Sequence, residues 1–196
     1  MRISDDRYSR DRLRLDLALR FIHHEARTHT IRAWTGLTDD RIRKLYRTYL
    51  YEADGAKVAR HRGKSPRQAA FFTRSLRMRR ESAVFASVSS LFGLITPQTI
   101  RVARSAESAP TVARGALLCE TFEAYTALMG DSQISFEHAV FLLGALLAGD
   151  ELRLAHCRDC SGVLVTDRLA LRVPVCNECA ANDPYCADPA EEDVTA

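Results

Sequence analysis

Long apolar runs are missing from this chain of 196 residues. The longest run, Ala139 to Ala148, has about half the length that a membrane-spanning helix needs. The first residues, Met1 to Arg14, also lack the apolar stretch of a secretory signal. We therefore predict a cytoplasmic protein that does not contact a membrane.

Catalytic motifs are missing as well. The chain contains no HExxH zinc-protease motif, no GxSxG nucleophile motif and no glycine-rich phosphate-binding loop. His23, His24 and Glu25 are adjacent, but neighbouring side chains on a helix point in different directions and do not converge on one ligand. We predict that the protein is not an enzyme and has no small-molecule substrate.

The charge is unevenly distributed, although the net formal charge is only +3. Residues 1–80 contain 21 Lys and Arg against 9 Asp and Glu, whereas the remainder contains 7 against 16. Clustered cations bind polyanions because they release counterions from the phosphates. The first part is therefore predicted to bind a polyanion; a basic helix face that only contacts solvent is the alternative.

The spacing of apolar residues is mostly that of helices. The predicted fold is mainly α: a helical bundle over residues 1–152 that binds DNA and a partner, a small four-cysteine zinc-ribbon-like module over 153–181, and a mobile acidic tail over 182–196. The apolar run Ala139 to Ala148 is predicted to be a buried helix, and the apolar helices in the middle of the chain are expected to leave surface for a partner or a second copy of the chain. Further helices are predicted over Asp11–Arg27, Arg67–Leu94, Pro97–Glu107, Pro110–Met129 and Ser135–Leu152.

Four of the six cysteines have the spacing of a metal site. Two CxxC pairs, Cys157 with Cys160 and Cys176 with Cys179, are typical of a structural site that holds one Zn²⁺, because four thiolates complete a tetrahedron. Strand-like segments, Val163–Val165 and Leu171–Val175, are expected to form the hairpin that brings the pairs together. The cations expected to offset the thiolate charge are Arg153, Arg158, Arg168 and Arg172.

A helix, a turn at Gly36 and a second helix capped by Thr38 are predicted between about Thr28 and Tyr51. This is the arrangement of a helix-turn-helix, whose second helix enters the major groove of DNA; an ordinary helical pair is the alternative. Asp39 and Asp40 argue against DNA unless they accept from cytosine or orient an arginine. The candidate DNA-binding residues are Arg41, Arg43, Lys44 and Arg47 on the second helix, and Lys57, Arg60, Arg62 and Lys64 on the following loop.

The order of these parts resembles the FlhC family of flagellar transcriptional activator subunits. The resemblance covers roughly Arg10 to Ala180 and rests on the segment IRKLYR within Gly36–Arg47, the loop RGKSP at Arg62–Pro66, the helical middle and the terminal CxxC pairs. It implies a bacterial activator that assembles with FlhD into a heterohexamer, binds promoters of flagellar operons and activates RNA polymerase. The family's zinc ligands correspond to Cys157, Cys160, Cys176 and Cys179.

Two rival functions follow from the same residues. The first is a zinc-ribbon adaptor that binds only protein, with its basic half against an acidic partner. The second is a small nuclease or thiol-disulfide oxidoreductase, against which the missing cluster of magnesium-binding carboxylates argues.

Overall fold

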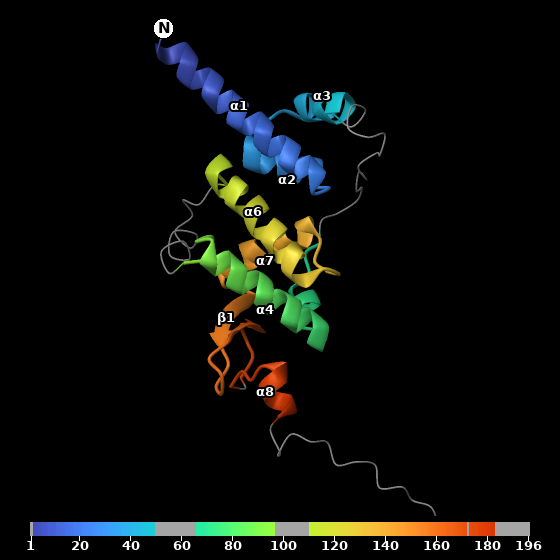
Figure 1. Ribbon diagram of the computed structural model, residues 1–196, viewed down its shortest axis with the longest axis vertical. Helices are drawn as coiled ribbons and strands as arrows, with labels where there is room; N and C mark the ends of the chain where they lie inside the picture. Colours follow the sequence, from blue (N-terminus) through green and yellow to red (C-terminus); the bar gives the residue numbers. More distant parts are fainter. Residues whose placement is uncertain (1, 50–65, 97–109, 172, 183–196) are drawn as a thin grey trace, which may run out of the picture.

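The computed structural model describes residues 2–49, 66–96, 110–171 and 173–182, and these residues form helices and one small hairpin (Figure 1). The mainly helical fold predicted from the sequence is confirmed. The predicted helix over Pro97–Glu107 and the acidic tail beyond Asn182 lie outside the described residues. The elements are α1 (Arg2–His23), α2 (Thr28–Thr35), α3 (Asp39–Tyr49), the 3₁₀ turn η1 (Ala69–Phe72), α4 (Leu76–Leu91), α6 (Val112–Met129), α7 (Phe136–Ala148), β1 (Leu152–His156), β2 (Val163–Asp167) and α8 (Asn177–Ala181).

Hydroxyl caps and left-handed glycines set the ends of several helices. A side-chain oxygen at the N-cap accepts an amide N–H that the first turn leaves without a helical partner. The caps are Ser75 for α4, Thr111 for α6 and Ser135 for α7. Gly36 ends α2 at φ 69°, and Gly149 ends α7 at φ 68°, a conformation that other residues adopt with strain.

The helix predicted over Arg67–Leu94 is wrong in its first part. Residues 69–72 form η1 instead, which buries Phe72 completely, and α4 starts only after Ser75. The Ser82 hydroxyl donates to the Phe72 carbonyl at 3.2 Å, so α4 holds the 3₁₀ turn against itself. Tertiary burial of one aromatic ring therefore outweighs the helical preference of this segment.

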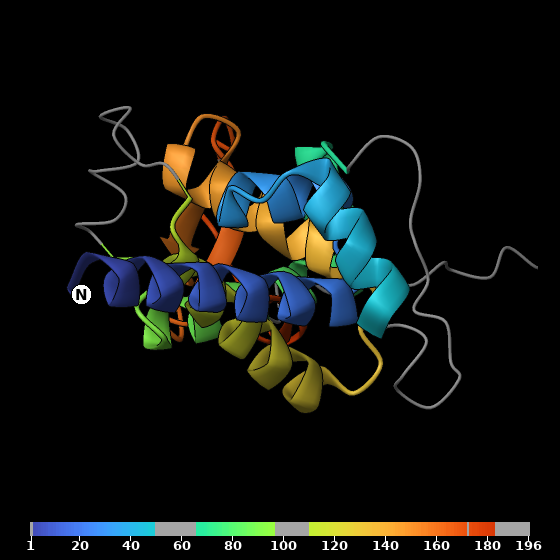
Figure 2. The ribbon, with the colours of Figure 1, turned by 90° about the horizontal axis from the view of Figure 1, so that it is seen from above.

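The core of the bundle is rich in aromatic rings. Phe136 of α7 packs edge-on against Phe21 of α1 at 4.9 Å and against Phe122 of α6 at 5.2 Å between ring centroids. Seen from above, α1 runs across the bundle with α2 and α3 beside it (Figure 2). Where α1 crosses α6, Gly115 brings the two helices so close that an added Cβ would lie 2.6 Å from Leu17.

The helix α7 belongs to this core, as predicted for the apolar run around Ala139–Ala148. Leu142, Leu143 and Leu146 are buried, as are most other apolar residues of α7. The protein's own helices and the hairpin therefore cover most of the apolar run around Ala139–Ala148, whereas Gly144 and Ala148 are exposed.

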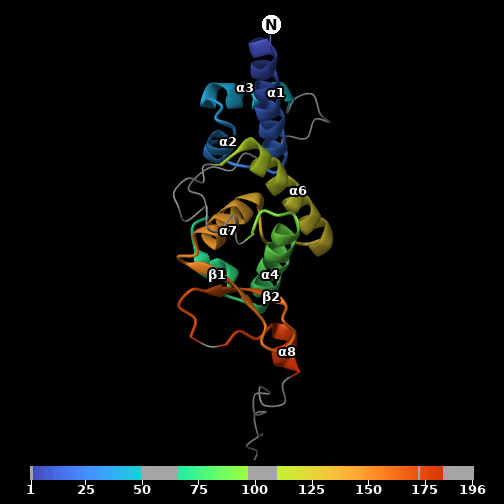
Figure 3. The same ribbon diagram turned by 90° about the vertical axis from the view of Figure 1, so that its left-hand side faces the viewer.

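The hairpin continues the same core. β1 and β2 pair antiparallel, with Leu152 opposite Asp167 and Leu154 opposite Val165. Leu152 and Val165 are buried in one cluster with the helical residues, and β2 packs on α4. The described elements are consequently stacked along one long axis, with α1, α2 and α3 at one end and α8 at the other (Figures 1 and 3).

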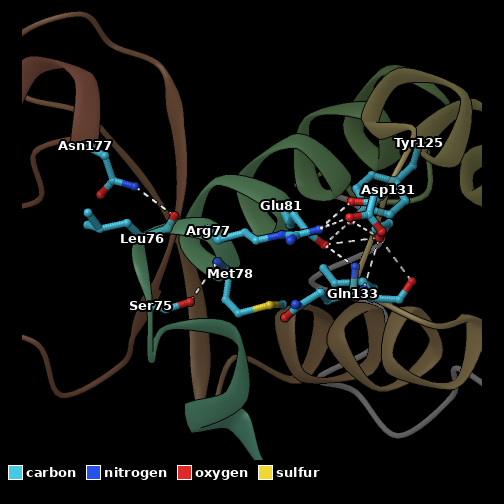
Figure 4. Close-up of polar contacts among 11 residues, drawn as sticks. Ser75, Leu76, Arg77, Met78, Glu81, Tyr125, Asp131, Gln133 and Asn177 are labelled. Atoms are coloured by element: carbon cyan, nitrogen blue, oxygen red, sulfur yellow. Dashed lines mark hydrogen bonds and ion pairs between the residues drawn. The ribbon is translucent and has the colours of Figure 1, made fainter.

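A buried carboxylate fixes the first half of α4. Glu81 is fully buried and accepts from the Arg77 guanidinium at 2.8 Å, the Gln133 amide at 2.9 Å and the Tyr125 hydroxyl at 3.0 Å (Figure 4). Burial by itself would raise the pKa of Glu81, but the hydrogen bonds from Arg77, Gln133, Tyr125 and Ser132 outweigh it and lower that pKa. The carboxylate thus joins α4 to α6 and to the turn before α7.

Candidate metal centre and helix-turn-helix surface

The first CxxC pair lies in the turn of the hairpin. The Cys157 amide donates to the Gly162 carbonyl at 2.8 Å, and the Ser161 amide donates to the Cys157 carbonyl at 2.9 Å. Ser161 has a φ of 60°, which turns the chain sharply after Cys160. At Gly162 an added Cβ would lie 3.3 Å from the Cys160 sulfur, so the absence of a side chain there makes room for that sulfur.

The second pair lies at the start of α8. Cys176 is the N-cap of this helix, and its sulfur accepts the Cys179 amide at 3.3 Å. The Arg158 amide donates to the Pro174 carbonyl at 3.0 Å, which brings the incoming chain against the first pair. The Cys176 amide then donates to the Cys157 sulfur at 3.2 Å.

The four sulfurs converge on one point. All four Sγ atoms lie within 4.8 Å of one another, and those of Cys160 and Cys176 are 3.7 Å apart. In a tetrahedron with metal–sulfur bonds of about 2.3 Å, the sulfurs are about 3.8 Å apart. All four cysteines are free thiols. The donor set therefore fits one metal ion with four thiolate ligands.

Amide hydrogen bonds favour the thiolate at one of the four positions. The pKa of Cys157 is lowered to about 6 because the backbone amides of Cys160 and Cys176 donate to its sulfur. The pKa of Cys179 is raised, because its sulfur shares hydrogen bonds with those of Cys176 and Cys160. A metal ion binds the deprotonated sulfur, so Cys157 is the position closest to its ligand form.

The hairpin itself differs from the prediction. The expected partner of Val163–Val165 was Leu171–Val175, but β2 pairs with Leu152–His156, the segment before the first cysteine pair. Leu171 and Val173 are exposed and form no strand. The sharp turn over residues 157–162 explains this pairing, because it returns the chain directly alongside the strand that precedes it.

Two of the arginines expected near the sulfurs lie at the other end of the hairpin. Arg168 donates to the Gly149 carbonyl at 3.2 Å, and Arg153 donates to the Ala170 carbonyl at 3.3 Å. Arg158 adjoins the cluster but forms an ion pair with Asp159 at 2.8 Å. Arg172 lies outside the described residues. Arg153 and Arg168 therefore do not offset charge at the sulfurs.

At the opposite end of the molecule, α2, the turn at Gly36 and α3 form the predicted helix-turn-helix-like segment. The Thr38 hydroxyl accepts the Arg41 amide at 3.4 Å, as expected of an N-cap. Ile42 and Tyr46 are buried, and the Tyr46 hydroxyl donates to the Ala26 carbonyl at 3.0 Å. These contacts fix one face of α3 against the bundle.

The other face of α3 carries the predicted cations. All four cationic candidates on this helix are exposed: Arg41, Arg43, Lys44 and Arg47. The four candidates on the following loop, Lys57, Arg60, Arg62 and Lys64, lie outside the described residues.

Each of the two aspartates at the start of α3 pairs with an arginine. Asp40 accepts from Arg43 at 3.0 Å, and Asp39 lies 3.6 Å from Arg32 of α2. One objection to DNA binding, two carboxylates near phosphate, is thereby reduced.

Sequence reasoning missed a groove beside the cysteine cluster. It runs along α4 towards α8, has a volume of about 1070 Å³, and is lined by Val84, Val88 and Val163 together with Cys160 and Cys176. Leu76, Leu91 and Leu128 along it are 66%, 85% and 69% exposed. Helical spacing alone assigns such leucines to a core. Only the folded structure shows that these three side chains are exposed at the surface.

None of the helices in the described ranges combines the length and hydropathy of a membrane span. In comparisons with known proteins, no protein-family model and no curated protein matches the chain. The functional conclusion therefore depends on the residues and their geometry.

Proposed function

We propose that this chain is a DNA-binding transcriptional activator subunit in which α3 enters the major groove. The observation that carries the proposal is the separation of the two faces of α3: Ile42 and Tyr46 are buried in the bundle, and four cations face outward. A recognition helix needs this division, because one face fixes its position while the other meets phosphates and base edges.

The four-cysteine cluster is proposed to hold one structural Zn²⁺. Thiolate ligands select soft or borderline metals, and zinc prefers the tetrahedral arrangement that four sulfurs form. The ligands are Cys157, Cys160, Cys176 and Cys179, and with all four positions filled the metal has no open site for a substrate. The cluster lies at the end of the molecule opposite α3, so its role is to stabilise the fold.

The family resemblance of the sequence supports the biological setting of this proposal. In that setting the chain acts in the cytoplasm with FlhD as partner, in a heterohexamer that binds flagellar operon promoters and activates RNA polymerase.

A salt titration tests DNA binding. The zinc-loaded chain, co-expressed with FlhD, is titrated with a flagellar promoter fragment and with a scrambled fragment. Binding should prefer the promoter and weaken steeply with salt. The double variant Arg43→Ala, Arg47→Ala should lower the affinity and flatten the salt dependence, because each phosphate contact that is lost reduces the slope of log K against log salt by about 1.

The matched control removes two exposed arginines of α1, Arg12→Ala and Arg14→Ala, which lie outside the proposed interface. This variant should keep the parent slope. An unchanged slope in the α3 variant would place the interface elsewhere on the molecule.

The groove along α4 favours a second candidate, an adaptor whose zinc module binds an apolar segment of another protein. Exposed Leu76, Leu91 and Leu128 are the observation behind it. Such binding depends on apolar burial and persists at high salt, whereas a phosphate interface does not. Retention of a captured partner at high salt, with no promoter preference, would support the adaptor.

A further inference from the structure

Asp40 and Arg43 lie one helical turn apart on the exposed face of α3. Arg43 Nη1 donates to Asp40 Oδ1 at 3.0 Å, and the two side chains are 54% and 84% exposed. A carboxylate at the front of a DNA-binding helix repels phosphates, so it weakens binding unless it performs a task there. The pair therefore calls for an explanation within the proposed function.

The chemistry of the guanidinium supplies one. Arginine has five N–H donors in one plane, and a bond from Nη1 to Asp40 leaves Nη2 and Nε for a second partner. Guanine presents two acceptors, O6 and N7, side by side in the major groove, and a guanidinium that donates to both is the commonest specific contact to a base. Near the start of a recognition helix, side chains reach base edges more readily than they do further along.

We infer that Asp40 is a positioning residue that holds Arg43 for a contact to one guanine in the major groove. This inference rests on the proposed function. Asp40 fixes the torsions of a long side chain before DNA arrives, so less conformational freedom is lost on binding. Asp40 thereby contributes to sequence preference although its charge disfavours DNA binding in general.

The neighbouring Asp39 has a different environment. It lies at the first residue of α3, 3.6 Å from Arg32, and this contact crosses the turn to α2. Asp39 therefore helps to join the two helices, whereas Asp40 contacts a cation of its own helix that faces outward. A simpler role for Asp40 is helix stabilisation, because an acidic residue near a helix N-terminus is favourable and an exposed ion pair of this spacing stabilises a helix slightly.

A base-preference experiment separates the two roles. The zinc-loaded chain, co-expressed with FlhD, is used to select duplexes from a random pool, and each base pair of the selected site is then substituted singly. For the parent, one guanine should be preferred by about tenfold or more over other bases. Arg43→Ala should abolish this preference, and Asp40→Ala should weaken it at the same base pair.

Two further results are expected of a positioning role. Asp40→Ala should bind non-specific duplexes as tightly as the parent or more tightly, because a negative charge is removed. The double variant Asp40→Ala, Arg43→Ala should discriminate no worse than Arg43→Ala alone, since Asp40 acts only through Arg43.

The matched control is Asp11→Ala. Asp11 and Arg14 form an exposed ion pair of the same spacing on α1, at 3.7 Å, and removing Asp11 should leave every base preference unchanged. Hydrogen exchange over residues 39–49, compared with the parent at the binding temperature, checks that α3 remains helical in Asp40→Ala.

Two outcomes would overturn the inference in different ways. If Asp40→Ala tightens binding to every duplex equally and keeps the guanine preference, Asp40 is only a helix-stabilising charge, and the proposed function stands. If the parent shows neither base preference nor salt dependence, the proposed function fails, and Asp40 has no base contact to position.

Discussion

Glu81 shows how much one residue contributes to this fold. It is a charged group in the core, and its lowered pKa means that the folded chain binds its proton more weakly than the unfolded chain does. The free energy of unfolding therefore includes a contribution that is present above the ordinary pKa of 4.5 and is lost as the pH falls through the lower, folded value.

Glu81→Gln should lower the free energy of unfolding at pH 7 by about 2 to 3 kcal/mol, because hydrogen bonds to a buried charge are replaced by weaker bonds to an amide. The variant should also lose less stability than the parent when the pH falls below 4.5. Urea unfolding at a series of pH values measures both effects. If the free energy of unfolding changes with pH in the same way for both proteins, the lowered pKa of Glu81 is contradicted.

Substitution by alanine should change the stability of the protein in opposite directions at two glycines in helices. Gly115→Ala places a Cβ 2.6 Å from Leu17 and 3.2 Å from Trp34, so strain should exceed the gain in helix propensity, with a net loss of about 1 kcal/mol. Gly144→Ala adds a Cβ with nothing within 4 Å and should gain up to about 1 kcal/mol. Thermal unfolding of both variants checks the pair, and equal shifts would contradict the close contact at Gly115.

At the scale of the element, helical periodicity and caps predicted most helices, although α1 spans Arg2–His23 rather than Asp11–Arg27 and α7 ends at Ala148 rather than at Leu152. Thr38 and Gly36 mark ends where the sequence placed them, and α6 ends at Met129 as predicted. The failures involve burial and turn geometry, which helical periodicity does not describe. Burial of Phe72 against α4 turns the chain into η1, and the sharp turn after Cys157 pairs Val163–Asp167 with Leu152–His156. The spacing of apolar residues and the helix caps predict neither the burial of Phe72 nor this turn.

The substitution Gly36→Ala, which adds one methyl group, tests the turn between α2 and α3. Gly36 has a φ of 69°, and a residue with a Cβ loses about 1 kcal/mol in that conformation. Gly36→Ala should therefore lower the free energy of unfolding by about that amount and, under the proposed function, weaken DNA binding, because a change in this turn would move α3 relative to α2. A variant as stable as the parent would show that the turn tolerates another conformation.

At the scale of the whole molecule, the cysteine cluster and the helices depend on each other. β2 packs on α4, and the Asn177 side chain donates to the Leu76 carbonyl at 3.0 Å, so α8 is tied to the first turn of α4 (Figure 4). CxxC spacing predicted the four cysteines that meet, because that chemistry is local. It did not predict that the hairpin completes the helical core.

Metal removal should therefore destabilise the elements near the cysteine cluster and leave the elements at the far end of the long axis unchanged. Chelation, or Cys157→Ala, should remove the metal and increase hydrogen exchange in residues 152–182 and in α4, while α2 and α3 remain protected. Cys119→Ala serves as the control, since Cys119 is buried in α6 away from the cluster and its loss should leave the metal content unchanged. A metal-free Cys157→Ala protein with parent protection throughout would contradict a structural role for the metal.

The packing of β2 on α4 also has a consequence for synthesis on the ribosome. α4 leaves the ribosome well before Val165, and at about 5 to 20 residues per second several seconds separate them. During that interval the face of α4 that receives the hairpin is uncovered and open to chaperones or proteases. The supply of metal when the last cysteines emerge should therefore influence how many nascent chains reach the folded state.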